Sequence, residues 1–286
     1  KVPFNPHYWE CGDTQMTFCS LCSSVLIFFG LESMITFKEL LGEFNGADNL
    51  VKIGVKDSFD FTGKDQVFLI ESGSVLVYGE KDTKTGVRAT QTFGTHDPIG
   101  FAEAIASREV QLEFKPLTDL TLVRFDGAKL RNQVNTANIF SKTIIKYSLG
   151  RIFKIKRSTN NFAFEDDFIN KTDKLFSRIK FAQDQIIFSA GSDSKKMFFI
   201  EKGSIQIVSK SAKIIANLNG GECFGEAALL NNRTRNYTAI AQKESTLLVI
   251  EESIVDRELS KDPPLVRLSV LVLLKRLELM NKMRMF

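Results

Sequence analysis

The stretch Val67-Phe-Leu-Ile-Glu-Ser-Gly-Ser-Val-Leu-Val-Tyr78 occurs again in the second half of the chain, as Met197-Phe-Phe-Ile-Glu-Lys-Gly-Ser-Ile-Gln-Ile-Val208. Five of the twelve positions are identical, and most of the others exchange one apolar residue for another. Runs of β-branched and aromatic residues on both sides of a glycine are typical of a pair of short strands. The stretch therefore predicts a β-domain that is present twice in the chain.

The repeat continues downstream at a constant, slightly shorter spacing. Thr121-Leu122 aligns with Thr246-Leu247, and Leu149-Gly-Arg-Ile152 aligns with Leu274-Lys-Arg-Leu277. The loop after Tyr78 absorbs the difference between the two spacings. A length of 286 residues also favours two domains over one. We therefore expect a partly helical N-terminal extension over residues 1–45, a first domain over 46–156 and a second domain over 157–286.

Each copy is predicted to be mainly β, with flanking helices. In the second copy, short β-rich runs alternate with Gly, Asn and Asp, at 185–188, 197–200, 205–208, 214–215 and 246–250. This spacing predicts a small antiparallel barrel, or jelly roll. A helical pattern follows each set of strands, at 139–156 and at 263–285, where a proline pair suits a helix start. A short helix is expected between the copies, at 168–181.

The composition excludes several classes of protein. With 43% hydrophobic and 25% charged residues, the chain is globular. A net charge of +4 without a basic run is unlike a nucleic-acid-binding surface, so no nucleic-acid partner is expected. No apolar stretch approaches the roughly 20 residues that span a membrane, and no signal peptide opens the sequence. The four cysteines are too few for a disulfide scaffold. We therefore expect a cytoplasmic protein without a membrane span.

The two histidines, His7 and His96, make most enzyme classes improbable. Metal-dependent cupin oxygenases and Ser/His hydrolases need imidazoles as ligands or bases, and neither histidine has a second one at useful spacing. His7, Cys11, Cys19 and Cys22 have a spacing that could hold zinc, but their apolar surroundings favour buried structural cysteines. We expect no metal site, no cofactor and no catalytic residue.

One segment carries ligand chemistry, Gly221-Glu-Cys-Phe-Gly-Glu-Ala-Ala-Leu-Leu-Asn-Asn-Arg-Thr-Arg-Asn-Tyr-Thr-Ala239. Phe224-Gly225-Glu226 indicates a turn that opens a very short helix, whose first backbone N–H groups are free to bind an anion. Arg235 follows shortly after Glu226, beyond a polar turn. A carboxylate, a guanidinium and free amides in so short a span could hold a ring that displays hydroxyl and phosphate groups. A cyclic nucleotide is such a ring.

The segment resembles the phosphate-binding cassette of the cyclic nucleotide-binding domain family. That cassette reads Phe-Gly-Glu, a small residue, Ala-Leu-Leu and, a few residues on, Pro-Arg, with Thr234 here in place of the usual proline. The resemblance covers both repeats and implies tandem cyclic nucleotide-binding domains. It implies that Glu226 accepts a hydrogen bond from the ribose 2′-hydroxyl of cAMP or cGMP and that Arg235 pairs with the cyclic phosphate. The residues assigned to the ligand are Phe224, Gly225, Glu226, Ala227, Arg235, Asn236 and Tyr237.

Two questions about this site stay open. Asn236 stands where the family has Ala or, often in cGMP binders, Ser or Thr, and its amide suits either purine. The preferred base is therefore not determined. In the alternative interpretation, Glu226 and Arg235 merely form an ion pair on a surface loop.

The first copy lacks both polar anchors of the cassette. In the register of the downstream repeat, Phe101 replaces Glu226 and Val110 replaces Arg235. We therefore predict a degenerate first domain, which binds no cyclic nucleotide and instead packs, dimerises or presents a surface to a partner.

The final helical segment is apolar on more than one face, so it is either deeply buried or pairs with another chain. In the family, a helix after the barrel carries the conformational response, and an apolar residue there often covers the purine. Met280, Met283 and Phe286 are the candidates for such a lid.

The sequence contains no helix-turn-helix, P-loop, kinase motif set or channel span after the second barrel. The expected function is therefore a cyclic nucleotide sensor or regulatory adaptor, which binds one nucleotide and changes a surface for a protein partner or a homodimer. One alternative is a protein kinase regulatory subunit, although the N-terminal part lacks an Arg-Arg-x-Ser/Ala inhibitory segment. Another is a structural scaffold whose two barrels no longer sense a ligand.

Overall fold

The computed structural model describes residues 37–44, 49–61, 63, 65–81, 86, 88–110, 112–153, 176–193, 195–226 and 234–283. Residues 35–286 form one compact unit, and residues 1–36 lie outside the described part. The elements up to residue 153 are α1 (Phe37–Gly42), β1 (Leu50–Ile53), β2 (Gln66–Ser72), β3 (Val75–Lys81), β4 (Arg88–Phe93), β5 (Pro98–Ile99), α2 (Phe101–Ile105), β6 (Glu113–Pro116), β7 (Leu120–Asp126), α3 (Gly127–Thr136) and α4 (Ile139–Ile152).

The second copy begins, in the described part, with a strand. Its elements are β8 (Ser177–Phe181), β9 (Ile186–Phe188), β10 (Lys196–Lys202), β11 (Ser204–Val208), β12 (Ile214–Asn219), β13 (Cys223–Phe224), β14 (Thr238–Ala241), β15 (Ser245–Glu251), α6 (Glu252–Leu259) and α7 (Pro264–Met283).

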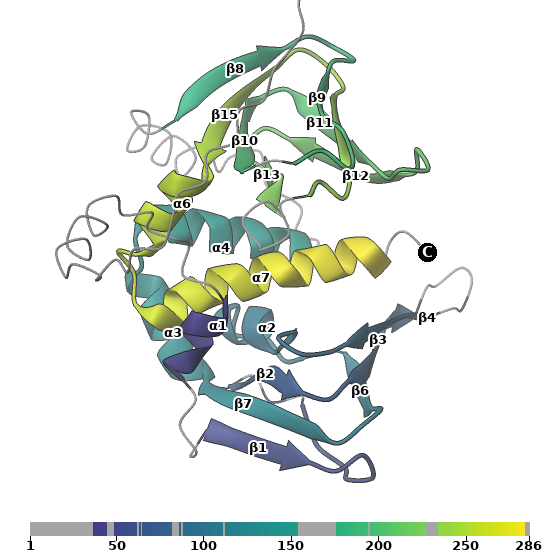
Figure 1. Cartoon of the computed structure of the whole chain (residues 1–286), viewed down its shortest axis with the longest axis vertical. Helices are drawn as coiled ribbons and strands as arrows, with labels where there is room; N and C mark the ends of the chain where they lie inside the picture. The colour runs from purple at the N-terminus through teal and green to yellow at the C-terminus, as the bar shows by residue number, and fades with distance from the viewer. Residues whose placement is uncertain are drawn as a thin grey trace, which may run out of the picture. The chain divides into compact units, whose positions relative to one another are not determined.

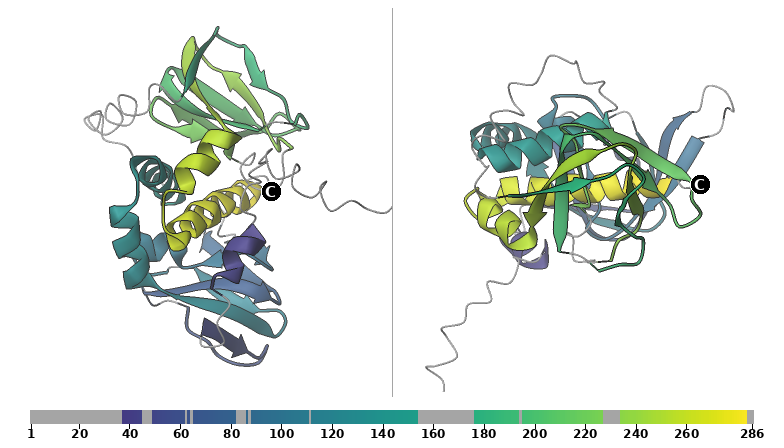
Figure 2. Two further views of the ribbon diagram at one scale, coloured as in Figure 1. Left: turned by 60° about the vertical axis from the view of Figure 1, so that its left-hand side comes forward. Right: turned by 90° about the horizontal axis from the view of Figure 1, so that it is seen from above.

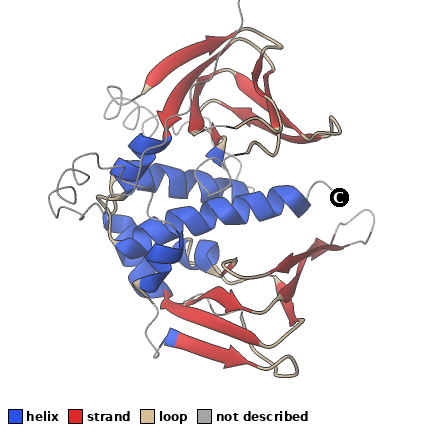
Figure 3. Ribbon diagram, in the orientation of Figure 1, coloured by secondary structure: helices blue, strands red, loops and turns tan. Residues whose placement is uncertain are grey.

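Each copy consists of two antiparallel sheets followed by helices, which confirms the predicted fold class. The first copy has strand orders β1-β7-β2-β5 and β4-β3-β6, and the second has β13-β10-β15-β8 and β12-β11-β14-β9. The two strands of the repeated sequence are β2 and β3 in one copy and β10 and β11 in the other. Figure 3 shows the strands of the two copies on either side of the helices.

The central strand of each copy has four consecutive apolar residues in its middle, because both faces are buried there. In β2, Val67 and Leu69 belong to a large cluster around the helices, whereas Phe68 and Ile70 belong to the interior of the first barrel. Strand β10 divides its residues in the same way, with Met197 and Phe199 in the helical cluster and Phe198 and Ile200 inside the second barrel. The helical cluster therefore contains residues of both copies.

The glycine that recurs in the repeat is required by the turn. Gly73 and Gly203 have φ angles of 93° and 101°. A Cβ atom would overlap the Asp119 carbonyl oxygen at the first position and Ser245 Oγ at the second. Only glycine fits a left-handed turn with so close a neighbour.

Helices α4 and α7 lie side by side between the two barrels (Figures 1 and 2). Helix α7 also contacts α1, α2, α3, β4 and β5, which are all elements of the first half of the chain. Its buried residues lie on more than one face, and Leu279 reaches the interior cluster of the first barrel. The sequence left two alternatives for this apolar helix, deep burial or pairing with another chain, and the structure shows it buried within its own chain. Its residues without exposed surface are Val266, Leu268, Ser269, Val270, Val272 and Leu274.

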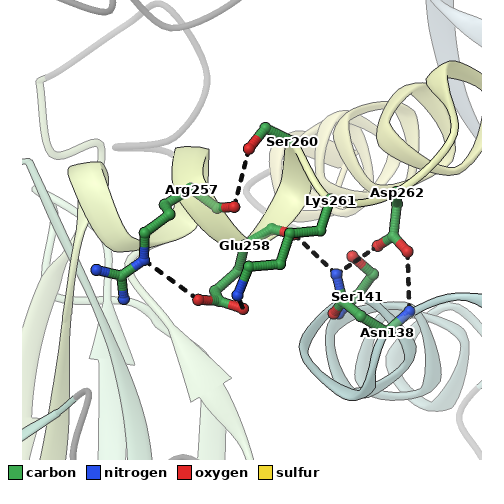
Figure 4. Close-up of polar contacts among 7 residues, drawn as sticks. All are labelled: Asn138, Ser141, Arg257, Glu258, Ser260, Lys261 and Asp262. Atoms are coloured by element: carbon green, nitrogen blue, oxygen red, sulfur yellow. Dashed lines mark hydrogen bonds and ion pairs between the residues drawn. The ribbon is translucent and has the colours of Figure 1, made fainter.

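A polar junction connects the start of α4 to the turn before α7 (Figure 4). The side-chain oxygen of Asn138 accepts a hydrogen bond from the Ser141 backbone N–H at 3.0 Å, as an N-cap does. The amide nitrogen of the same side chain donates to Asp262 Oδ2 and to the Glu258 carbonyl oxygen, each at 2.7 Å. Asn138 therefore caps one helix and bonds to the other copy.

The helix expected at 168–181 is wrong over its last residues. Ser177–Phe181 is strand β8, which pairs with β15 along its whole length. The run Ser-Arg-Ile-Lys-Phe alternates polar and apolar side chains, so it fits the free edge of β15, and this pairing is non-local. Residues 168–175 lie outside the described part, as do 154–156 of the helix expected at 139–156. Among the helices that the structure describes, none is long and apolar enough to cross a bilayer.

Candidate functional site

The turn that carries the predicted anion site follows β13. Gly225 has a φ of 80°, in the left-handed region that favours glycine. A Cβ atom there would lie 2.7 Å from Nη1 of Arg235. The glycine of the motif is therefore needed both by the backbone and by the guanidinium that packs against it.

Arg235 is only 2% exposed, and its guanidinium lies within the barrel wall. Nη1 donates a hydrogen bond to the Gly225 carbonyl oxygen at 2.7 Å, and Nη2 donates to the Lys196 carbonyl oxygen. The guanidinium carbon lies 4.1 Å from the ring centroid of Phe188, within the range of a cation–π contact. Backbone carbonyls and an aromatic face thus hold the cation in one orientation.

Burial has an electrostatic cost at this position. Loss of water lowers the pKa of Arg235 to about 10, because the attraction of Glu226 and Asp193 offsets the desolvation only in part. The side chain is still charged at neutral pH, but it is less stable there than in water. An anion bound beside it would remove that deficit.

Glu226 is also buried, with 8% of its surface exposed. Its Oε1 lies 3.9 Å from Nη1 of Arg151, which belongs to α4 of the first copy. The same Nη1 donates to the Tyr147 hydroxyl at 2.8 Å, and that hydroxyl donates to the Cys223 carbonyl oxygen. Burial raises the pKa of Tyr147 well above its usual value, so the hydroxyl stays a neutral donor.

The sequence prediction missed Arg151 and Tyr147. The signal that could have found Arg151 is its place in the repeat, since Leu149-Gly-Arg-Ile152 aligns with Leu274-Lys-Arg-Leu277. The equivalent position in α7 is also an arginine, Arg276. The alternative interpretation of a surface ion pair requires Glu226 and Arg235 to be exposed, but both are buried.

The other predicted ligand residues lie as follows. Phe224 and Tyr237 are buried in the core of the second barrel, and Asn236 is half-buried. Met280 packs, partly buried, against the helical cluster. Several residues lie outside the described part of the chain, namely His7, Cys11, Cys19, Cys22, Ala227 and Phe286, together with the side chain of Met283. In the described residues, no three His, Cys, Asp or Glu side chains are grouped as metal ligands would be.

The corresponding place in the first copy is nearly full. Gly100 directly follows β5, as Gly225 directly follows β13 in the second copy, and both glycines have a φ of 80°. Phe101 and Val110, which replace the two polar anchors, are buried. They line a cavity of about 10 Å³ that Val272 and Arg276 of α7 also line. That volume is sufficient for about one water molecule.

Residues 178–262 match the family described as the cyclic nucleotide-binding domain. A cAMP/cGMP-dependent 3′,5′-cAMP/cGMP phosphodiesterase B of Dictyostelium discoideum is 39% identical over 87 residues, which are 27% of this chain and 8% of that protein. A cAMP-dependent protein kinase regulatory subunit of Debaryomyces hansenii is 24% identical over 217 residues, 74% of this chain and 43% of that protein. The chain thus spans less than half the length of either relative.

Two solved structures are also similar. The cAMP-bound form of an EAL enzyme is 34% identical and covers 35% of this chain and 28% of its own, with a TM-score of 0.33. The regulatory domain of Toxoplasma gondii PKA with cAMP is 14% identical over 76% of this chain and 82% of its own, with a TM-score of 0.32. The family match encloses the turn with Glu226 and the buried Arg235, and residues 178–262 of this chain are a cyclic nucleotide-binding domain.

Proposed function

We propose that the chain is a cyclic nucleotide sensor, which binds one molecule of cAMP or cGMP in its second barrel and changes a surface for a protein partner. The observation that carries the proposal is the buried guanidinium of Arg235, whose lowered pKa reflects a desolvation cost that an anion would offset. A cyclic phosphate is such an anion, and Glu226 lies in the adjoining turn to accept from the ribose.

The proposed roles follow from the chemistry of each group. Arg235 pairs with the cyclic phosphate, since a charge-assisted hydrogen bond contributes roughly 1.5 to 3 kcal/mol. Glu226 is assigned to accept from the ribose 2′-hydroxyl, and the backbone amides from Gly225 to Ala227 are assigned to the phosphate. Asn236 and Tyr237, which follow Arg235 in the chain, are assigned to the same site.

A single ligand per chain is proposed because the first copy offers neither anchor nor space. Phe101 and Val110 occupy the anchor positions, and the cavity beside them measures about 10 Å³. Side chains of α7 line this cavity, so the first domain, 46–156, serves as a packing surface for the helix of the second domain, 157–286.

The response to the ligand is assigned to α7, whose Met280, Met283 or Phe286 would cover the base. A ligand shifts such an equilibrium only by its differential affinity for two states, typically about 1 to 3 kcal/mol. None of these roles needs a catalytic residue, so we propose a regulatory protein and not an enzyme.

A second candidate is a protein kinase regulatory subunit. The match over 74% of this chain to the Debaryomyces hansenii protein favours it. In that case, the chain would inhibit a purified protein kinase catalytic subunit, and a cyclic nucleotide would relieve the inhibition. A sensor of another kind would leave the kinase rate unchanged under both conditions.

Isothermal titration calorimetry with cAMP and with cGMP tests the proposal. We expect one site per chain for at least one of the two nucleotides. Arg235→Ala should weaken binding by roughly 10- to 100-fold, because the buried phosphate loses its charged partner. Arg178→Ala, which removes a half-exposed arginine from β8 of the same barrel, should leave the dissociation constant within about twofold.

The absence of heat with either nucleotide would overturn the sensor and leave the scaffold interpretation. Two bound ligands per chain would overturn the assignment of a single site to the second barrel.

A further inference from the structure

Two arginines occupy equivalent positions of the repeat, Arg151 in α4 and Arg276 in α7. Arg151 lies 3.9 Å from Glu226, a residue of the second copy. Arg276 lines the cavity of the first copy together with Glu103, whose negative charge attracts it. The helix at the end of each copy therefore has an arginine that interacts with a carboxylate of the other copy. Arg151 interacts with Glu226, and Arg276 with Glu103 at the corresponding turn.

A chain of two hydrogen bonds links Arg151 through Tyr147 to the ligand turn. Nη1 of Arg151 donates to the Tyr147 hydroxyl at 2.8 Å, one helical turn earlier on α4. The same hydroxyl donates to the Cys223 carbonyl oxygen, just before Glu226 in the chain. These hydrogen bonds connect the guanidinium to the backbone of the ligand turn. The side chains of Arg151 and Glu226 are each only 11% exposed.

The charges around the turn also assign a task to Arg151. If a cyclic phosphate binds beside Arg235, as proposed, the buried Glu226 carboxylate of the same site repels it, because charges that are shielded from water interact strongly. Arg235 balances the phosphate and Arg151 the carboxylate. Glu222 also attracts Arg151 and Asp193 also attracts Arg235, so the loss of either guanidinium would leave uncompensated negative charge beside a bound phosphate.

We propose that Arg151, supplied by the first copy, is a positioning residue that holds the Glu226 carboxylate for the ribose 2′-hydroxyl and so determines the preference for ribonucleotides. This inference rests on the proposed function of the second barrel. In this proposal both copies contribute residues to the nucleotide site, because α4 of the first copy supplies Arg151.

The test compares the cyclic nucleotide that the wild-type chain binds with its 2′-deoxy analogue, by calorimetry on the full chain. Loss of a hydrogen bond to a charged acceptor should make wild-type binding of the deoxy analogue roughly 10- to 100-fold weaker. In Arg151→Met, the carboxylate loses its positioning cation, and the ratio of the two dissociation constants should fall to within about threefold of unity. Arg151→Lys keeps a cation on a flexible chain and should restore part of the ratio.

Arg276→Met is the matched control, since it removes the equivalent arginine from the other helix, where the side chain lines the first copy's cavity. It should retain the wild-type ratio. An unchanged ratio in Arg151→Met would overturn the proposal, and so would an equal fall in Arg276→Met, because that result indicates general loosening of the helices. If Arg151→Met does not fold, Arg151→Lys decides: a ratio equal to that of the wild type contradicts the proposal.

The failure of this inference is distinguishable from the failure of the proposed function. Wild-type chain that binds neither cAMP nor cGMP contradicts the proposed function. Wild-type chain that binds a nucleotide but discriminates equally well without Arg151 contradicts only the role of this residue.

Discussion

Asp256 has a carboxyl group that the fold partly buries. It lies in α6, and burial, followed by the negative charge of Glu252, raises the pKa of Asp256 to about 6. Because the folded chain binds this proton more tightly than the unfolded chain does, the ionised side chain destabilises the fold above pH 6. The penalty decreases as the pH falls through 6 and disappears below the unfolded value of about 3.9.

Asp256→Asn should therefore stabilise the chain at neutral pH. We expect a gain of about 1 kcal/mol in the free energy of unfolding at pH 7.5, reduced from the full effect because the group is partly exposed. The gain should vanish near pH 4. Urea denaturation at both pH values measures it, with exposed Glu109→Gln as the control. An equal gain at pH 4 would mean that the effect does not come from titration.

At the same scale, the sequence predicted one half of the ligand chemistry and missed the other. Glu226 and Arg235 were found because both lie within one short segment, in which the spacing of the carboxylate and the guanidinium is typical of an anion-binding turn. Arg151 lies in the first copy, far ahead of Glu226 in the chain, and its contact depends on how α4 packs against the second copy. A local pattern cannot report a contact that tertiary packing creates.

Helix α4 shows how a single side chain can serve an element and its neighbour. Asn138 caps the helix through its oxygen and bonds to Asp262 and Glu258 through its nitrogen. An N-cap contributes about 1 kcal/mol, and a hydrogen bond to a carboxylate adds more. The two contributions can be separated, because serine preserves only the first.

Asn138→Ala should lower the free energy of unfolding by about 2 kcal/mol or more, and Asn138→Ser by about half as much. Urea denaturation followed by circular dichroism checks both values. Exposed Asn132→Ala, in the preceding helix α3, should change the stability by less than about 0.5 kcal/mol. Equal losses in the serine and alanine variants would contradict the separation of the two contributions, because the cap that serine preserves would then add nothing.

Among the elements, the long apolar patterns were predictable and the edge strand was not. The helix expected at 263–285 is observed as Pro264–Met283, because a proline pair and a continuous apolar surface specify it locally. Strand β8 depends on pairing with β15, the last strand of the same barrel and distant from it in the sequence. Its short run contains too little local information to distinguish a strand from a short helix.

At the scale of the whole molecule, the two copies share one core. The helical cluster contains Val67 and Leu69 of β2, Met197 and Phe199 of β10, and most of α7. A protein whose domains are joined in this way should unfold as one cooperative unit, since neither copy can open without exposing apolar surface of the other.

Leu274→Ala, at a fully buried position of α7, tests this expectation. It should destabilise the chain by about 2 to 5 kcal/mol. Hydrogen exchange followed by mass spectrometry should then rise in peptides of both β2 and β10. Ile214→Ala, at an exposed position of β12, serves as the control. Faster exchange in only one of the two strands would show that the copies are independent.

Leu279 packs inside the first barrel, although the whole second barrel separates it in sequence from β7, the last strand of the first. During translation, the first barrel therefore leaves the ribosome with an incomplete interior, which closes only when Leu279 has been synthesised. Contacts of such long sequence separation slow folding and keep apolar surface open for longer. We therefore expect a chaperone to bind most readily before Leu279 is synthesised, while the apolar interior of the first barrel is still exposed.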